Sequence, residues 1–144
     1  MMKGMDVRGQ VSVEYLLVVL VLILVLSLVT VPLIGQSLDA SSDVSSASDA
    51  KIAVENIANA ADVVYANGPG AKRTLTVYIP QTTQLVTFNN TVGLNITYSN
   101  GTAGIINTTT QYPVANNTFA VSEGWHTVVV TWQLNNNYVS YTIT

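Results

Sequence analysis

The sequence predicts an α+β protein, with a long N-terminal hydrophobic helix followed by a small antiparallel β-sandwich-like head domain. Two observations predict this fold. An apolar segment of bilayer length lies near the N-terminus, and from Ala71 onward short runs of Val, Thr, Ile and Tyr alternate with turn residues. Between them, Gly68-Pro69-Gly70 stops any helix. A chain of 144 residues has room for one modest domain and one membrane-length segment.

The composition excludes several classes of function. Charged residues make up 9% of the chain, hydrophobic residues make up 49%, and the net charge is −3. Nucleic-acid binding needs clustered Lys and Arg, and the five basic residues form no patch, so we expect no nucleic-acid partner. The absence of cysteine excludes disulfides, thiolate chemistry and Cys-ligated metals. We expect neither a cofactor nor a metal.

The segment of bilayer length is Tyr15–Ile34. Its 20 residues form a helix about 30 Å long, and none of them is charged. A helix that is apolar all round has to be buried on every side, in lipid or in a bundle. Lys3 and Arg8 precede the segment, and the next basic residue is Lys51. The positive-inside rule therefore predicts a cytoplasmic N-terminus and an exported C-terminal domain.

Two simpler interpretations of this segment have to be weighed. An ordinary secretory signal has an apolar core of about 7–15 residues and a small-residue cleavage site. Here the apolar run is longer, and no A-x-A site closes it. A permanent signal-anchor stays open, because composition alone does not reject it.

The residues that flank the segment carry a more specific pattern, GQVSVEYLL. They resemble the class III signal peptide of archaeal type IV pilins, in which Gln-x-Ser-x-Glu-Tyr-Leu follows a short basic leader. Every defined position of that pattern is matched, by Gln10, Ser12, Glu14, Tyr15 and Leu16. The resemblance implies that a membrane aspartic protease, the prepilin peptidase, removes the leader 1–9 by cleaving between Gly9 and Gln10.

The resemblance also gives Glu14 a role in assembly. A charge at the centre of an apolar span costs about 2.5–3.5 kcal/mol, so Glu14 needs a partner or an interface. The family's acidic residue meets the N-terminal amine of a neighbouring subunit, which implies that Glu14 sets the register between subunits. If Gln10 cyclises, that amine is lost and Glu14 needs other hydrogen bonds. A carboxylate in the lipid headgroup layer is the simpler alternative.

The implied function is that of a structural subunit, a pilin, in an archaeal type IV pilus-like filament at the cell surface, serving adhesion. The implied partners are identical subunits in a helical filament, the prepilin peptidase, an assembly ATPase with its membrane platform, and the membrane before assembly. Sixteen Leu, Ile and Val residues from Leu16 to Ile34 favour the membrane over water by roughly 5–10 kcal/mol. The alternative is a single-pass membrane-anchored surface glycoprotein that does not polymerise.

The helix is expected to continue beyond the apolar segment. We assign residues 10–35 to the filament-core or transmembrane helix, 36–67 to a continuing helix that packs on the head, and 71–144 to the exported head. An apolar stripe supports the continuing helix and consists of Val54, Ile57, Ala61 and Val64. Pro32 and Gly35 predict a kink, and the Ser and Asp residues that follow predict a loosened helix as far as Ser48.

Seven strands are predicted from the β-rich part of the chain. Their ranges are Thr74–Pro80, Gln84–Phe88, Thr91–Tyr98, Ala103–Asn107, Thr118–Ser122, Trp125–Asn135 and Tyr138–Thr144. Asn100-Gly101 predicts a two-residue hairpin turn, and the three Asn residues 135–137 predict the turn between the last two strands.

The head also carries five Asn-x-Thr sequons, each a possible acceptor of an N-linked glycan in an exported domain. The acceptors are Asn89, Asn95, Asn100, Asn107 and Asn116. Strand alternation places Asn95 on the face opposite Leu94 and Ile96, where it should point at solvent. An Asn- and Thr-rich composition also produces sequons by chance, so ordinary polar strand and turn residues are the alternative.

No catalytic constellation can be assembled from the sequence, and we expect that the protein is not an enzyme. His126 is the only histidine and should share a face with Val128, Val130, Trp132 and Leu134. A hydrogen-bonded histidine at the edge of the core explains it better than a base or a ligand does. Glu123 is the one acid of the β-domain, so no acid–base pair or metal cluster forms.

Overall fold

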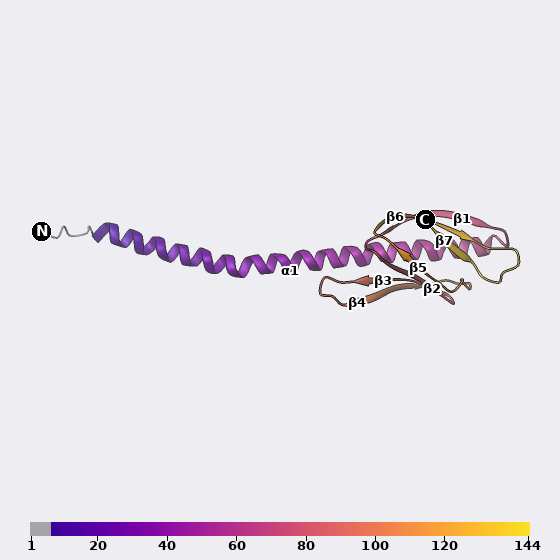
Figure 1. The fold of residues 1–144 in the computed structure, drawn as a ribbon. Helices are drawn as coiled ribbons and strands as arrows, with labels where there is room; N and C mark the ends of the chain where they lie inside the picture. Colours follow the sequence, from indigo (N-terminus) through magenta and orange to yellow (C-terminus); the bar gives the residue numbers. More distant parts are fainter. Residues whose placement is uncertain (1–6) are drawn as a thin grey trace. The chain divides into compact units, whose positions relative to one another are not determined.

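The computed structural model describes residues 7–144, with side chains from Val11 onward. It contains the helix α1 (Val7–Ala66), which is followed by strands (Figure 1). The strands in the described residues are β1 (Lys72–Ile79), β2 (Thr83–Phe88), β3 (Thr91–Thr97), β4 (Ala103–Thr109), β5 (Asn117–Val121), β6 (Gly124–Thr131) and β7 (Ser140–Ile143). The predicted α+β class, a long N-terminal apolar helix followed by an antiparallel β-head, is confirmed.

The chain divides into two compact units, residues 1–40 and residues 41–144. We call the second unit the head. It includes the second half of α1 together with every strand. Each unit is described by itself below.

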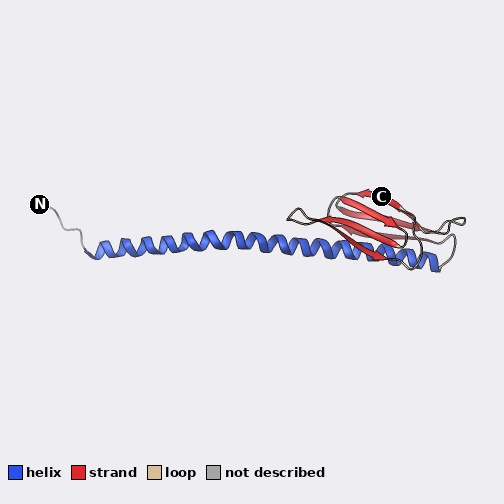
Figure 2. Cartoon of the chain, turned by 90° about the horizontal axis from the view of Figure 1, so that it is seen from below, coloured by secondary structure: helices blue, strands red, loops and turns tan. Residues whose placement is uncertain are grey.

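The strands of the head form two antiparallel sheets (Figure 2). One sheet has the order β1-β6-β7, and the other has the order β4-β3-β2-β5. A parallel bridge between Val114 and Val139 joins the segments that lead into β5 and β7. Two sheets with apolar inner faces have to cover those faces, and here both contribute to one core.

The second half of α1 supplies the rest of that core. Its buried residues recur at helical spacing and are Ala50, Ala53, Val54, Ile57, Ala58, Ala60, Ala61 and Val64. They join one cluster with inward-facing residues of both sheets, among them Leu85, Leu94 and Val128. The predicted apolar stripe and its packing against the β-domain are confirmed. The many alanines let the strands approach the helix closely, so a thin head still has a continuous core.

The expected loosening of the helix between Pro32 and Ser48 is wrong, because α1 stays helical throughout this stretch. Asp and Ser weaken a helix when their side chains bond to the local backbone. Here the Asp43 carboxylate bonds to Ser99 instead, accepting from its backbone N–H at 2.9 Å and its hydroxyl at 2.6 Å. At Asp43, a long-range contact thus replaces the bond to the local backbone that the sequence suggested.

The hairpin at Asn100-Gly101 differs from the prediction in its loop length. Thr97 pairs with Ala103, and the Tyr98 N–H donates to the Thr102 carbonyl at 2.9 Å, which leaves a three-residue loop. Gly101 has the positive φ of 80° that such a loop requires. The two-residue loop is instead Asn89-Asn90 between β2 and β3, where Asn89 has a φ of 52°. The predicted strand ranges already left Asn89-Asn90 as a two-residue connection, so of these two loops only the one at Asn100-Gly101 was predicted with the wrong length.

The predicted strand Trp125–Asn135 extends too far, because β6 ends at Thr131. The Trp132 indole N–H donates to the Asn136 carbonyl at 2.7 Å, and the Asn136 N–H donates to Gln133, so the chain turns here. Leu134 is consequently 77% exposed and does not share the core face of Val128 and Val130. The first six residues of the strand kept the predicted alternation.

Candidate functional site

The first unit presents an uncovered apolar helix. Every residue from Val11 to Ala40 is exposed, and Leu28 reaches 75%. A large exposed apolar surface on a soluble monomer rarely exceeds a few hundred Å², and it marks a membrane or protein interface when it does. The exposed side chains surround the helix because leucines, isoleucines and valines follow one another without a polar stripe.

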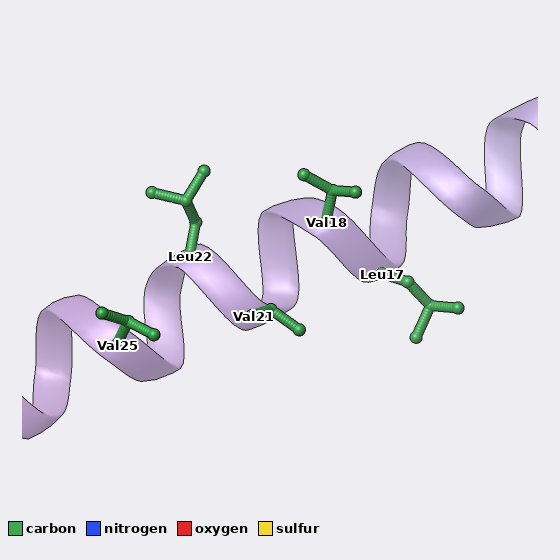
Figure 3. Close-up of a pocket in the computed structure, with 5 residues that line it drawn as sticks. All are labelled: Leu17, Val18, Val21, Leu22 and Val25. Carbon is green, nitrogen blue, oxygen red and sulfur yellow. The ribbon is translucent and has the colours of Figure 1, made fainter.

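Five of these side chains show the arrangement directly (Figure 3). Leu17, Val18, Val21, Leu22 and Val25 line a shallow apolar depression, and all of them belong to α1. Their spacing along the sequence places them on one face of the helix (Figure 3). A depression lined by one helix encloses no ligand, but it offers the ridges and grooves into which another helix or lipid chains can pack.

In the part of the chain that is described, α1 is the one helix long and apolar enough to cross a bilayer. Its most apolar window has a mean hydropathy of 3.2. This criterion rests on length and composition alone, and signal sequences near an N-terminus also meet it. The helix is therefore compatible with membrane anchoring.

Glu14 is an exposed residue of α1, seven residues after its first residue, Val7. Among the side chains that the structure describes, none forms an ion pair with it. The predicted cleavage site, Gly9 and Gln10, lies in α1 by its backbone, but its side chains lie outside the described residues. Residues 1–6 of the predicted leader lie outside them entirely. The cleavage and the register role of Glu14 stay predictions.

Pro32 and Gly35 lie inside α1, which continues on both sides of them. Pro32 has no backbone N–H, so the Leu28 carbonyl receives no helical hydrogen bond from it. A Cβ placed on Gly35 would meet nothing within 4 Å, so no contact in this chain requires a glycine there. The predicted kink at these residues stays a prediction.

The five sequon acceptors differ in accessibility. Asn89, Asn100, Asn107 and Asn116 are exposed, and Asn95 is half-buried. Asn95 lies opposite the core-facing side chains as expected, but its Oδ1 is buried without a hydrogen-bond partner. The expectation that its amide points at solvent is therefore wrong for this oxygen. The reason is that β3 is a central strand, so neighbours flank its outer face as well.

His126 is half-buried and lies two residues after Gly124, the first residue of β6. Its Nε2 lies 2.8 Å from the Ser122 carbonyl oxygen. Since a carbonyl only accepts, the ring nitrogen has to donate, which fits the predicted hydrogen-bonded histidine at the edge of the core. Within residues 7–144, no group of three His, Asp or Glu side chains could hold a metal ion.

Sequence reasoning missed an aromatic stack at the end of α1. The Tyr65 ring lies between the Tyr112 ring, at 4.0 Å, and the Trp132 ring, at 4.2 Å. The interplanar angles of 13° and 9° make both contacts stacked. The three residues are far apart in the sequence, so only the folded chain reveals them. The stack joins the end of α1 to the segment between β4 and β5 and to the residue that follows β6.

Sequence reasoning also missed an open groove between α1 and β1. Its lining residues are Asp49, Ile52, Ala53, Asn56, Thr76, Val77, Tyr78 and Trp125. Trp125 is 72% exposed, and its ring centroid lies 5.4 Å from that of Tyr78. No protein-family model, curated protein or solved structure matches this chain.

Proposed function

We propose that this chain is the structural subunit of an archaeal type IV pilus-like surface filament that polymerises through its N-terminal hydrophobic helix. The observation that carries the proposal is the all-round exposure of α1 from Val11 to Ala40, directly after the residues that resemble a class III signal peptide. Such a surface requires lipid before assembly and neighbouring helices after it. The compact head, which has its own core, would form the outside of the filament.

The proposal assigns a sequence of steps to the chain. The precursor inserts with its N-terminus in the cytoplasm, and the prepilin peptidase cleaves between Gly9 and Gln10. An assembly ATPase with a membrane platform then transfers the helix from bilayer to bundle. This transfer needs a machine because a bundle gains no hydrophobic energy over lipid. N-linked glycans on the head and adhesion of the filament complete the proposed function.

The mass of the N-terminal peptide from material sheared off the cell surface is the first test. A peptide that begins at Gln10, or at its cyclised form, supports cleavage and filament assembly. A chain that stays in the membrane fraction and begins at one of the leader methionines supports the membrane-anchored glycoprotein instead.

The register role of Glu14 is tested by Glu14→Ala. We expect cleavage before Gln10 to continue while the yield of sheared filaments falls. With Glu14, a subunit in a wrong register buries an unpaired charge, which disfavours that register. Without Glu14 this penalty is absent, so wrong registers compete with the correct one. The control is Asp39→Ala, which removes an exposed acid from the other end of the apolar part of α1. Filaments at normal yield from the Glu14→Ala chain would rule the register role out.

A further inference from the structure

The sheet β1-β6-β7 has two ends that differ in chemistry. At one end, which we call the near end, Tyr78 pairs with Trp125 across β1 and β6, beside residues 49–56 of α1. At the far end, where α1 finishes at Ala66, Lys72 pairs with Thr131. The two ends of β6 are about 24 Å apart, since its 8 residues span seven steps of about 3.4 Å.

The near end carries the groove between α1 and β1. Ile52 is 54% exposed on the helix side of this groove, and Trp125 is 72% exposed on the strand side. The tilted ring of Tyr78 supports that of Trp125, at an interplanar angle of 58°. Aromatic side chains in a groove with a polar rim are characteristic of interface centres, where they contribute most of the binding energy.

The most exposed large apolar side chain at the far end, among the described residues, is Leu134. It lies in the loop between β6 and β7 and is 77% exposed. The loop is fixed by the Trp132 indole bond to Asn136 and by the stacking of Trp132 on Tyr65. A side chain presented by a fixed loop loses little conformational freedom on binding, which favours association.

Charge distinguishes the two ends in the same way. Asp49 lines the near-end groove and Glu123 precedes Trp125 by two residues, and neither forms an ion pair among the described side chains. Lys72 and Arg73 are exposed at the far end, again without an ion pair in the described part of the chain. Complementary potentials of this kind orient association and set its register.

Asp62 lies on the last turns of α1 and is the acid that could oppose this polarity. Its carboxylate is half-buried and accepts from the Gln111 N–H at 2.9 Å, so it is directed toward the loop before β5. The far end is therefore basic where it is exposed around the start of β1.

The sequons indicate which side of the head is free for protein contact. All five acceptors lie between Asn89 and Asn116, within or beside the sheet β4-β3-β2-β5. The sheet β1-β6-β7 and the helix carry none. Glycans would crowd the sheet β4-β3-β2-β5 and leave the groove beside β1 accessible.

We propose that the heads of successive copies of this chain dock head to tail, with Leu134 of one copy in the Ile52–Trp125 groove of the next. Lys72 and Arg73 of the first copy then face Asp49 and Glu123 of the second. The two surfaces differ, so the contact repeats without closing and suits an open helical filament. This inference rests on the proposed function and names the contact between heads.

Cross-linking of cysteine pairs tests the contact, because the natural chain has no cysteine. The pair Leu134→Cys with Thr76→Cys places one thiol on the projecting loop and one in the groove. A disulfide needs Cα atoms within about 7 Å, so oxidation of sheared filaments should give a ladder of dimers, trimers and longer species. The matched control pair is Leu134→Cys with Ala120→Cys, whose second position is exposed on the sequon-bearing sheet, lies outside the sequons and should give no ladder.

Charge reversal gives an independent readout. Lys72→Glu with Arg73→Glu should lower the yield of sheared filaments about tenfold, and the added changes Asp49→Lys and Glu123→Lys should restore it. Two results would overturn the docking and leave the pilin proposal standing. One is a normal yield of filaments from the charge-reversed chain, and the other is filaments of the Leu134→Cys, Thr76→Cys chain that give no ladder.

Surface material without filaments from the unaltered chain would overturn the pilin proposal. In that case, a ladder in the membrane fraction would retain the contact between heads, and its absence would reject the contact too.

Discussion

Two side-chain oxygens in the described part of the head are buried without a hydrogen-bond partner, Oδ1 of Asn95 and Oη of Tyr141. A buried polar atom left unpaired costs about 1–3 kcal/mol. The cost contrasts with Thr87, whose buried hydroxyl donates to the Ala115 carbonyl at 2.6 Å and accepts from the Asn117 N–H at 3.2 Å. At the residue scale, polar pairing therefore contributes to the stability of this head beside its apolar core.

Tyr141 predicts an alkaline loss of stability. Burial first, and the Asp62 carboxylate second, raise the pKa of Tyr141. Unfolded tyrosine titrates near pH 10, so above about that pH the unfolded chain releases a proton that the folded chain retains. The contribution of this group is complete below about pH 10 and is lost as the pH rises toward its folded pKa.

Tyr141→Phe should therefore weaken the fall in the free energy of unfolding between about pH 9 and pH 11. It should cost little at neutral pH, because the hydroxyl has no partner to lose. Denaturant titration of the full chain in detergent measures both effects. Tyr138→Phe is the control, since its side chain is 41% exposed. An unchanged alkaline slope in Tyr141→Phe would contradict the assignment.

Asn95 should be the least occupied of the five sequons in the mature protein. A glycan needs room around the amide, and Asn95 is half-buried with a covered Oδ1, whereas Asn107 on the edge strand β4 is exposed. Peptide mass spectrometry measures the occupancy of each site. Trypsin finds no Lys or Arg after Arg73, so a protease that cleaves at aromatic residues is needed. Full occupancy at Asn95 with an empty Asn107 would contradict the argument from burial.

At the scale of elements, α1 has one role in each unit. Its first part exposes apolar side chains all round, and its second part buries a stripe against the sheets. The transition occurs near Asp43, which holds the tip of the β3–β4 hairpin through two hydrogen bonds to Ser99. Hydrogen bonds to a carboxylate are roughly twice as strong as neutral ones, so one side chain fixes a whole hairpin end.

Asp43→Ala should release that hairpin tip without unfolding the head. We expect the Ser99 amide to exchange its hydrogen faster, and the head to lose about 1.5–3 kcal/mol at most. Hydrogen exchange followed by mass spectrometry detects the change in the peptide that contains residues 98–102. Ser42→Ala is the matched control, because Ser42 is an exposed neighbour on α1. Equal exchange in both variants would show that the tip is held by other contacts.

At the scale of the whole molecule, the head is self-sufficient in its packing. Every buried residue of the described chain lies between Ala50 and Tyr141, and the hydrogen bonds to the hairpin tip begin at Asp43. The apolar part of α1 contributes no residue to this core. Packing of the head core therefore does not depend on how the apolar part of α1 is covered.

The fragment 41–144 should accordingly fold without the first 40 residues. We expect a water-soluble chain with a cooperative thermal transition, because its core loses nothing on truncation. Circular dichroism during heating measures the transition, and sedimentation measures solubility. Val54→Asp in the same fragment is the negative control, since it buries an unpaired charge at a position with 0% exposure. A fragment that is unfolded or insoluble would show that the head needs the apolar helix.

The sequence alone determined the features that depend on neighbours along the chain. The run from Leu16 to Leu26 determines a helix that is apolar all round. Alternation in Leu75, Val77 and Ile79 gave the inner face of β1, and the spacing of Val54 and Ile57 gave the helix stripe. Each of these patterns is local, so the periods of helix and strand suffice to interpret it.

Only the tertiary structure decided the features that depend on residues far apart in the sequence. Asp43 stabilises a helix that looked weak because Ser99 draws its carboxylate away, and Leu134 leaves the core because Trp132 turns the chain onto Tyr65. Asn95 loses its solvent because β3 is central in its sheet. Burial and hydrogen bonding at these positions are set by partners that lie about 40 to 70 residues away or on adjacent strands, and a local pattern carries no information about them.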